Sequence, residues 1–408
     1  MSRDFDLIVW GATGFTGQLV VEYLANTYGV DGDLRWAIAG RNQAKLQQVR
    51  KDCLAEQQRE HLAIFTADSS DADSLQALTN RAAVICTTVG PYAIHGTPLV
   101  EACATTGTHY CDLTGEVQWM AKVIPLYQDR ARESGARIVH TCGFDSIPSD
   151  MGTWFVQQAM LEQHGVAANK VSCRIGRSKG AAIGGTIASL LHVLEEAGHD
   201  PSVKQALADP YSLYPQGLAK GQDGPDQMGA VYDADFHQWT CPFIMSSINS
   251  RVVRRSHALM GLPWGEDFRY DESQLCKSRG AALRNTIAMG AGMATMALAP
   301  TRKLAQRFLP KPGDGPDRAA RESGFFELFL HAAHPSDRSK DLRAKVTGDM
   351  DPGYGSTSKM LSEAAVCLAK DDLTVDGGFW TPSSAMGENL RERLVSNAGL
   401  TFDLVPIP

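Results

Sequence analysis

Apolar residues follow two alternating patterns over the first 144 residues of the chain. Short apolar runs predict β-strands, and longer segments with apolar residues at helical spacing predict α-helices. The expected strands cover 5–12, 34–41, 61–68, 82–90, 108–116 and 136–144, and the expected helices cover 14–28, 42–58, 71–81, 97–107 and 117–135. This alternation is typical of right-handed βαβ units, so we predict an α/β fold with a doubly wound parallel sheet.

The pattern changes after about residue 150. Helices are expected over 149–165, 184–198 and 356–372, strands over 170–177 and 251–259, and an antiparallel pair over 325–334 and 341–349. Residues 199–245 are rich in Pro, Gly, Asp and Gln and are expected to form long loops. Because 408 residues are too many for one ordinary core, we expect a second domain of the α+β type.

Charge and cysteine usage narrow the class of protein. The formal net charge of −7 argues against a nucleic-acid partner and against general affinity for anionic membranes. The nine cysteines include no CxxC pair, so no metal site is expected, and several lie in apolar runs, as buried thiols of a reducing cytosol do. The N-terminus enters a strand without the layout of a signal peptide, so we expect a cytoplasmic protein.

Residues 285–300 form an uncharged, apolar stretch. It is shorter than the ~20 residues that a membrane-spanning helix needs. We therefore expect a buried or interfacial helix, whose small residues suit close packing or a wall that admits an acyl chain. Peripheral contact with a membrane or lipid is expected through this segment.

The strongest motif is a glycine-rich turn between the first strand and the first helix. It reads Gly11-Ala12-Thr13-Gly14-Phe15-Thr16-Gly17. Gly11 permits the tight turn, Gly14 lets the backbone approach a diphosphate, and Gly17 lets the helix pack closely on the strand. The amides at the helix N-terminus then face the phosphates. The motif predicts a Rossmann-type dinucleotide site that includes Thr13, Phe15 and Thr16.

The end of the second strand indicates which dinucleotide binds. An NAD site places an acidic residue there, whereas this chain has Arg41 and Asn42. The Arg41 guanidinium suits a ribose 2′-phosphate, with Lys45 nearby to assist, so NADPH is expected and NAD is disfavoured. The alternative is that Arg41 is a solvated surface residue. Asp68 ends the third strand and is expected either beside the adenine or as a helix cap.

The fourth strand ends in a loop that contains Val89, Gly90 and Pro91. Ligands of open α/β sheets bind at the carboxyl ends of the strands. We therefore expect this loop to pass the ribose and nicotinamide, with a plain turn as the alternative.

Several blocks of the sequence resemble the saccharopine dehydrogenase-like oxidoreductases, and more narrowly the branch of the trans-acting enoyl reductases. The blocks are GATGFTG, TTVGPYAIHGTPLVEACATTGTHYCDLTGE, IVHTCGFDSIPSDMG, GYGSTSKMLSEAAVCLA and GGFWTPSSAMGE. The resemblance implies a nicotinamide cofactor, a Rossmann domain over 1–150, an α+β substrate or dimerisation domain over 151–350, and a C-terminal segment, 351–408, that packs back on the first domain. It implies either an amino-acid adduct or an acyl chain of lipid or polyketide synthesis as the substrate.

Hydride transfer requires a group that supplies a proton. Tyr92 and His95 are the first candidates, because they follow the loop expected to face the nicotinamide. The other candidates each have a structural alternative, as core groups or helix caps: Tyr110, Asp112, Glu116, His140 and Asp145.

We expect an NADPH-dependent reductase of a hydrophobic, enoyl-type acyl substrate, working as a homo-oligomer. One alternative is a saccharopine-type enzyme that acts on an imine, for which Arg251, Arg254 and Arg255 could bind a charged substrate. Another is a non-catalytic NADP-binding scaffold at lipid surfaces.

Overall fold

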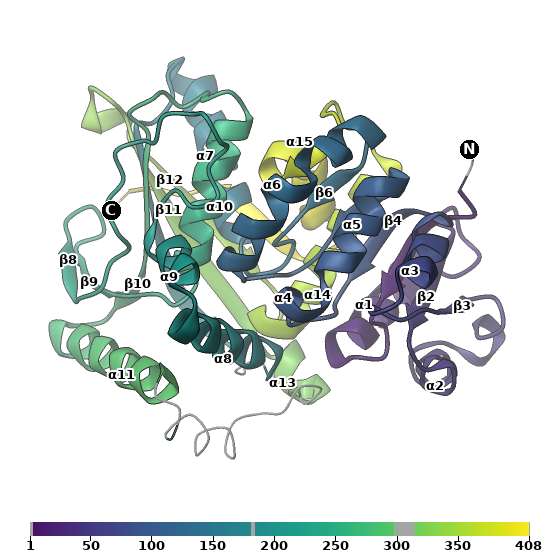
Figure 1. Ribbon diagram of the computed structural model, residues 1–408. Coiled ribbons are helices and arrows are strands. Elements are labelled where there is room, and N and C mark those ends of the chain that lie inside the picture. The colour runs from purple at the N-terminus through teal and green to yellow at the C-terminus, as the bar shows by residue number, and fades with distance from the viewer. Residues whose placement is uncertain (1–2, 181–183, 298–299, 301–314, 408) are drawn as a thin grey trace.

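Two seven-stranded sheets organise the molecule (Figure 1). The computed structural model describes residues 3–180, 184–297, 300 and 315–407. The first sheet is parallel and has the order β13-β6-β5-β4-β1-β2-β3. Its strands are β1 (Phe5–Trp10), β2 (Trp36–Gly40), β3 (Ala63–Thr66), β4 (Ala82–Thr87), β5 (His109–Cys111), β6 (Arg137–Val139) and β13 (Gly378–Trp380). The predicted α/β fold with a doubly wound parallel sheet is confirmed.

Helices cover both faces of this sheet, which explains why β1, β2 and β4 are almost wholly apolar and buried. One face carries α1 (Phe15–Tyr28), α2 (Gln43–Cys53) and α14 (Thr357–Lys370), and the other carries α3 (Ala72–Thr79), α5 (Thr97–Thr106) and α6 (Val117–Ser134). The short helix α4 (Tyr92–His95) follows β4, and a 3₁₀ turn, Glu56–Gln58, follows α2. The helix predicted over 42–58 ends early because Leu54 adopts an extended conformation and is buried.

The second sheet is mixed and has the order β14-β12-β11-β7-β10-β9-β8. Its strands are β7 (Lys170–Lys179), β8 (Val231–Asp233), β9 (Gln238–Cys241), β10 (Arg269–Cys276), β11 (Phe325–Ala333), β12 (Leu342–Gly348) and β14 (Leu400–Leu404). The predicted antiparallel pair is confirmed as β11 and β12. Helices α7 (Ile147–His164) and α10 (Ser246–Leu259) pack against β10, β11 and β12. The other elements are α8 (Gly184–His199), α9 (Pro201–Ala208), α11 (Arg279–Ala297), α13 (Arg318–Glu322), α15 (Pro382–Ser396) and two single turns, Arg338–Lys340 and Pro352–Ser356.

Two secondary-structure predictions for the second half are wrong. Residues 251–259, expected as a strand, belong to the helix α10, where Arg251, Arg254 and Arg255 are each at most 5% exposed. Apolar Val252 and Val253 suggested a strand, but the buried guanidiniums find partners that only the folded chain provides. The loops expected over 199–245 are also interrupted, by α9 and by the hairpin of β8 and β9.

The segment expected as a buried or interfacial helix, 285–300, falls mainly on α11. Among the described residues of α11, Ala282 is buried and most others are exposed. Of the two alternatives, burial is therefore wrong for this helix, and an interfacial position stays a prediction. Residues 298–299 lie outside the described residues. No helix in the described ranges is long and apolar enough to cross a membrane.

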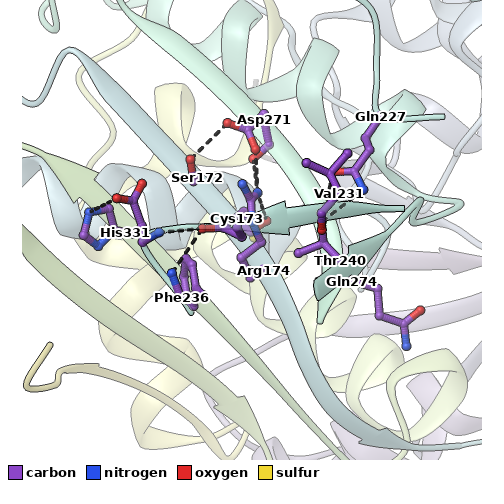
Figure 2. A network of polar contacts seen from close by, with 12 residues as sticks. Ser172, Cys173, Arg174, Gln227, Val231, Phe236, Thr240, Asp271, Gln274 and His331 are labelled. Atoms are coloured by element: carbon purple, nitrogen blue, oxygen red, sulfur yellow. Dashed lines mark hydrogen bonds and ion pairs between the residues drawn. The ribbon is translucent and has the colours of Figure 1, made fainter. Parts of the chain in front are cut away.

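A network of polar contacts connects the β8–β9 hairpin, at one edge of the second sheet, with β7 and β10 of the same sheet (Figure 2). The buried Arg174 on β7 contacts Asp233 at 2.5 Å and Asp271 at 2.5 Å. Asp233 in turn accepts hydrogen bonds from the amides of Asp235 and Phe236, and the Phe236 ring lies 5.8 Å from the Arg174 guanidinium. The network gives the buried cation on β7 one partner on β10 and one on the hairpin, so it ties these parts together.

The C-terminal segment contributes to both sheets. β13 pairs with β6 of the first sheet, and β14 pairs with β12 of the second. Helix α14 lies against α1, where the fully buried Glu363 accepts hydrogen bonds from Tyr23 at 2.6 Å and Tyr28 at 2.7 Å. Burial and the Glu363 carboxylate raise the pKa of both tyrosines, which therefore remain donors.

We expect Glu363→Ala to lower the free energy of unfolding by about 3 kcal/mol, because it leaves two phenols without their buried acceptor and removes one of the two carboxylates that pair with Arg393. Glu388→Ala is the matched control, since it removes an exposed pair with Arg391 and should cost less than about 1 kcal/mol. Urea denaturation measures both values. Equal effects of the two substitutions would contradict the assignment.

Candidate active site

The glycine-rich turn has the geometry that a diphosphate requires. Gly11 has φ = +87°, a conformation that favours glycine. A Cβ at Gly17 would lie 2.2 Å from the Gly11 carbonyl oxygen, so only glycine lets α1 start this close to β1. Gly14 is the N-cap of α1 and offers no side chain to its first-turn amides. The residues present therefore fit a dinucleotide, as the motif predicts.

A distant part of the chain approaches the same turn. The Phe15 ring packs edge-on against Tyr354, with centroids 4.8 Å apart. The Arg321 guanidinium, on α13, lies 5.5 Å from the Phe15 ring and donates a hydrogen bond to the Pro316 carbonyl. Arg321 is thus a cation beside the expected diphosphate site. No local motif indicates this role for Arg321, since only folding brings α13 to the turn.

The residues expected around the adenosine lie at the ends of β2 and β3. Arg41 is exposed, and Asn42 caps α2 by accepting a hydrogen bond from the Lys45 amide at 3.0 Å. Asp68 accepts hydrogen bonds from the Ser70 amide and hydroxyl, which lower the pKa of Asp68, and Arg41 and His95 lower it further. Arg41 and Asp68 are therefore near one another.

Asp68 is not a helix cap. Asp71 caps α3 instead, through the amides of Asp73 and Ser74. Of the two roles weighed for Asp68, the helix cap is excluded, and a position beside the adenine stays a prediction.

The loop after β4 abuts the glycine turn, because the Thr88 hydroxyl donates a hydrogen bond to the Gly11 carbonyl at 3.2 Å. Val89 and Pro91 are half-buried and Gly90 is exposed. In this strand order the connection reverses between β1 and β4, which is where open α/β sheets bind their ligands. The loop thus lies where the sequence analysis expects the ribose and nicotinamide to pass.

The two first candidates for proton transfer are poorly placed for that role. Tyr92 is 3% exposed, stacks on Trp119, and donates its hydroxyl hydrogen to the Thr87 carbonyl. Burial raises the pKa of Tyr92 well above its ordinary value. His95 is close enough to Asp68 to lower the pKa of that residue, which puts it toward the adenosine side.

Glu116, considered as a cap for α6, caps the neighbouring helix α4 instead. Its carboxylate accepts hydrogen bonds from the Tyr92 amide at 2.9 Å and the Ala93 amide at 2.8 Å. Ser189 of α8 donates to the same carboxylate at 2.8 Å, and burial raises the pKa of Glu116. Glu116 therefore fixes the loop after β4 and links it to α8.

Asp112 and His140 form a buried pair in which the His140 Nδ1 lies 2.7 Å from the carboxylate. Asp112 also accepts hydrogen bonds from the Tyr110 hydroxyl and from the amides of Thr114 and Thr141. This arrangement agrees with the structural alternative for Tyr110 and His140.

Asp145 is the carboxyl group that the fold leaves available at this edge. It follows β6, and a Cβ at Gly143 would lie 2.8 Å from its Oδ2, while one at Gly115 would lie 3.8 Å from its Oδ1. No side chain in the described part of the chain donates a hydrogen bond to it. Burial, aided by the charge of Asp112, raises the pKa of Asp145 to about 7. Near neutral pH it can therefore be protonated and donate.

A phosphate-binding turn at the reversal point of a doubly wound sheet is typical of dinucleotide-binding α/β proteins. Residues 7–139 match the family model described as the saccharopine dehydrogenase NADP binding domain. A Mycobacterium tuberculosis protein provisionally named as a trans-acting enoyl reductase is 41% identical over 407 residues, with 96% of each chain covered. A trans-acting enoyl reductase of Mycobacterium bovis is 34% identical over 410 residues, again with 96% of each chain covered. The chain belongs to the saccharopine dehydrogenase-like family, in the trans-acting enoyl reductase branch, and its cofactor is NADPH.

Among solved structures, the apo saccharopine dehydrogenase (L-Glu forming) of Saccharomyces cerevisiae aligns over 98% of this chain and 99% of its own, with 13% identity and a TM-score of 0.47.

We expect Arg41→Ser to raise the Kd for NADPH roughly tenfold or more and to leave the Kd for NADH unchanged, because only NADPH carries the 2′-phosphate. Lys51→Ser, at the exposed far end of α2, is the control. Fluorescence titration with each nucleotide measures both constants. An unchanged ratio of the two would remove Arg41 from the site.

We expect Arg321→Ala to raise the Kd for NADPH and for NADH to a similar extent, roughly tenfold, because both nucleotides carry the diphosphate. The same titration distinguishes this uniform loss from the selective loss in Arg41→Ser. Unaltered binding of both nucleotides would mean that Arg321 only packs against Phe15.

Proposed function

We propose that this protein is an NADPH-dependent reductase of α,β-unsaturated acyl thioesters in lipid or polyketide metabolism, with Asp145 as the proton donor. The observation that carries the proposal is the position and pKa of Asp145, an acid near neutrality at the edge expected to hold the nicotinamide. The names of the relatives support the enoyl substrate.

The bound NADPH supplies a hydride, which forms a C–H bond at the β-carbon of the enoyl group. Asp145 gives its proton to the α-carbon, and the resulting carboxylate takes a proton from water in the next cycle. Glu116 holds the loop after β4 through two amides, so that the substrate meets a fixed backbone. Half-buried Leu113, Phe144 and Met245 lie near Asp145 or its neighbouring glycines and suit an apolar acyl chain.

The imine alternative loses its expected substrate-binding residues. Arg251 pairs with Asp226, and Arg254 pairs with Asp223 at 2.6 Å. Arg255 donates hydrogen bonds to the carbonyls of Leu213 and Phe379. All three guanidiniums are buried and already have partners within the protein, so they are not available to bind a charged amino-acid adduct. Their positions therefore favour an uncharged acyl substrate.

We expect Asp145→Asn to lower kcat about 100-fold while leaving the Kd for NADPH unchanged, because the amide cannot supply the proton. In the wild type, kcat/KM should be constant below pH about 7 and fall above it as Asp145 loses its proton. Stopped-flow oxidation of NADPH against crotonyl thioesters measures both.

Asp150→Asn is the matched control, because burial also raises the pKa of Asp150, to about 6, but its carboxylate is held by Ser256 and Ser383. Asp150→Asn should change the free energy of unfolding but not the pH dependence of kcat/KM. A wild-type profile that does not change between pH 6 and 8, or full activity in Asp145→Asn, would refute the role of Asp145.

A panel of enoyl thioesters, imines and simple ketones tests the substrate class. Oxidation of NADPH with imines alone would overturn the acyl assignment. Tight binding of NADPH without turnover of any of these substrates would indicate a non-catalytic NADP-binding scaffold.

A further inference from the structure

Helix α11 stands at the outside of the molecule with two of its large apolar side chains exposed to water. Figure 1 shows it at the margin of the molecule, alongside the β8–β9 hairpin. The side chains of Leu283 and Ile287 are 45% and 69% exposed, one helical turn apart. Gly290, Ala291 and Ala294 continue the exposed strip toward the end of the helix. An uncharged, water-facing strip of this kind marks a contact surface.

The charged residues around this strip are basic, whereas the protein as a whole carries a negative net charge. The chain has a net charge of −7, yet the stretch from Ser273 to Gly313 contains no aspartate or glutamate. In the described part of this stretch Lys277, Arg279 and Arg284 are exposed, and no carboxylate of the described residues pairs with them. Arg284 lies next to Leu283 on the outward side. Apolar and basic groups thus share one surface, which is the composition of helices that bind at anionic lipid interfaces.

The helix is also connected to the candidate active site. α11 packs against α8, and Ser189 of α8 donates a hydrogen bond to Glu116. Glu116 in turn holds the loop after β4. One helix therefore separates the outward strip from the edge where an acyl substrate would react.

We propose that the outward surface of α11, defined by Leu283, Arg284, Ile287 and Ala291, docks on an anionic lipid surface. The apolar side chains enter the acyl boundary, and Arg284 with Lys277 and Arg279 contacts the head groups. The helix lies in the plane of the interface, since no described helix is apolar and long enough to span it. This deepens the proposed function, because it brings a hydrophobic substrate to the enzyme from the phase in which that substrate dissolves.

The test is co-sedimentation of the full-length protein with phosphatidylcholine vesicles, with and without phosphatidylglycerol, in the absence of substrate. We expect binding to the anionic vesicles alone, weakened by salt, and at least about tenfold weaker for Ile287→Glu and for Arg284→Glu. Leu126→Glu is the matched control on α6, because Leu126 is also 69% exposed, and it should bind as the wild type does.

Three outcomes overturn the proposal: no vesicle binding, equal binding to neutral vesicles, or equal loss in Leu126→Glu. Loss of a dimer in Ile287→Glu, seen by sedimentation velocity, together with no vesicle binding would assign the strip to a second copy of the chain. Capture of an acidic acyl-carrier protein in place of vesicles would assign it to a protein partner. Turnover of a short, water-soluble enoyl thioester should be unchanged in Ile287→Glu, so failure of docking and failure of the enoyl assignment give different results.

Discussion

The close approach of α1 to the end of β1 is the constraint on which the nucleotide site depends. Because no side chain separates Gly17 from the Gly11 carbonyl, the helix begins directly above the strand and its amides point along the edge of the sheet. The loop after β4 is then hydrogen-bonded to the same carbonyl through Thr88. Backbone geometry, rather than side-chain chemistry, thus shapes the site where we expect the dinucleotide to bind.

Local features of the chain are sufficient to predict the parallel sheet and to nominate the nucleotide site, whose residues stay a prediction. The glycine turn, Arg41 and the loop after β4 are each recognised from a few neighbouring residues, because a tight turn and a strand end impose local requirements. The parallel sheet followed from periodicity, since strands buried on both faces must be apolar throughout.

Residues whose role depends on neighbours far away in the chain could not be assigned from local sequence features. Asp145 was one of several acidic candidates, and its pKa depends on burial that the whole fold creates. Glu116 caps a helix that precedes it by more than twenty residues, and Arg321 reaches the turn from α13. The local pattern predicts a strand where α10 forms, because it does not show the partners of the three arginines. Three buried arginines in one helix are stable only when Asp226, Asp223 and two carbonyls are positioned to accept from them.

The pairing of β13 with β6 and of β14 with β12 has a consequence for folding. Both strands lie within residues 378–404 and belong to opposite sheets, and each covers an edge strand that would otherwise remain open. A polypeptide that lacks this short segment would have two unprotected sheet edges at once. Both sheets therefore depend on one short stretch of chain, and a polypeptide truncated before it would be a strong client for chaperones.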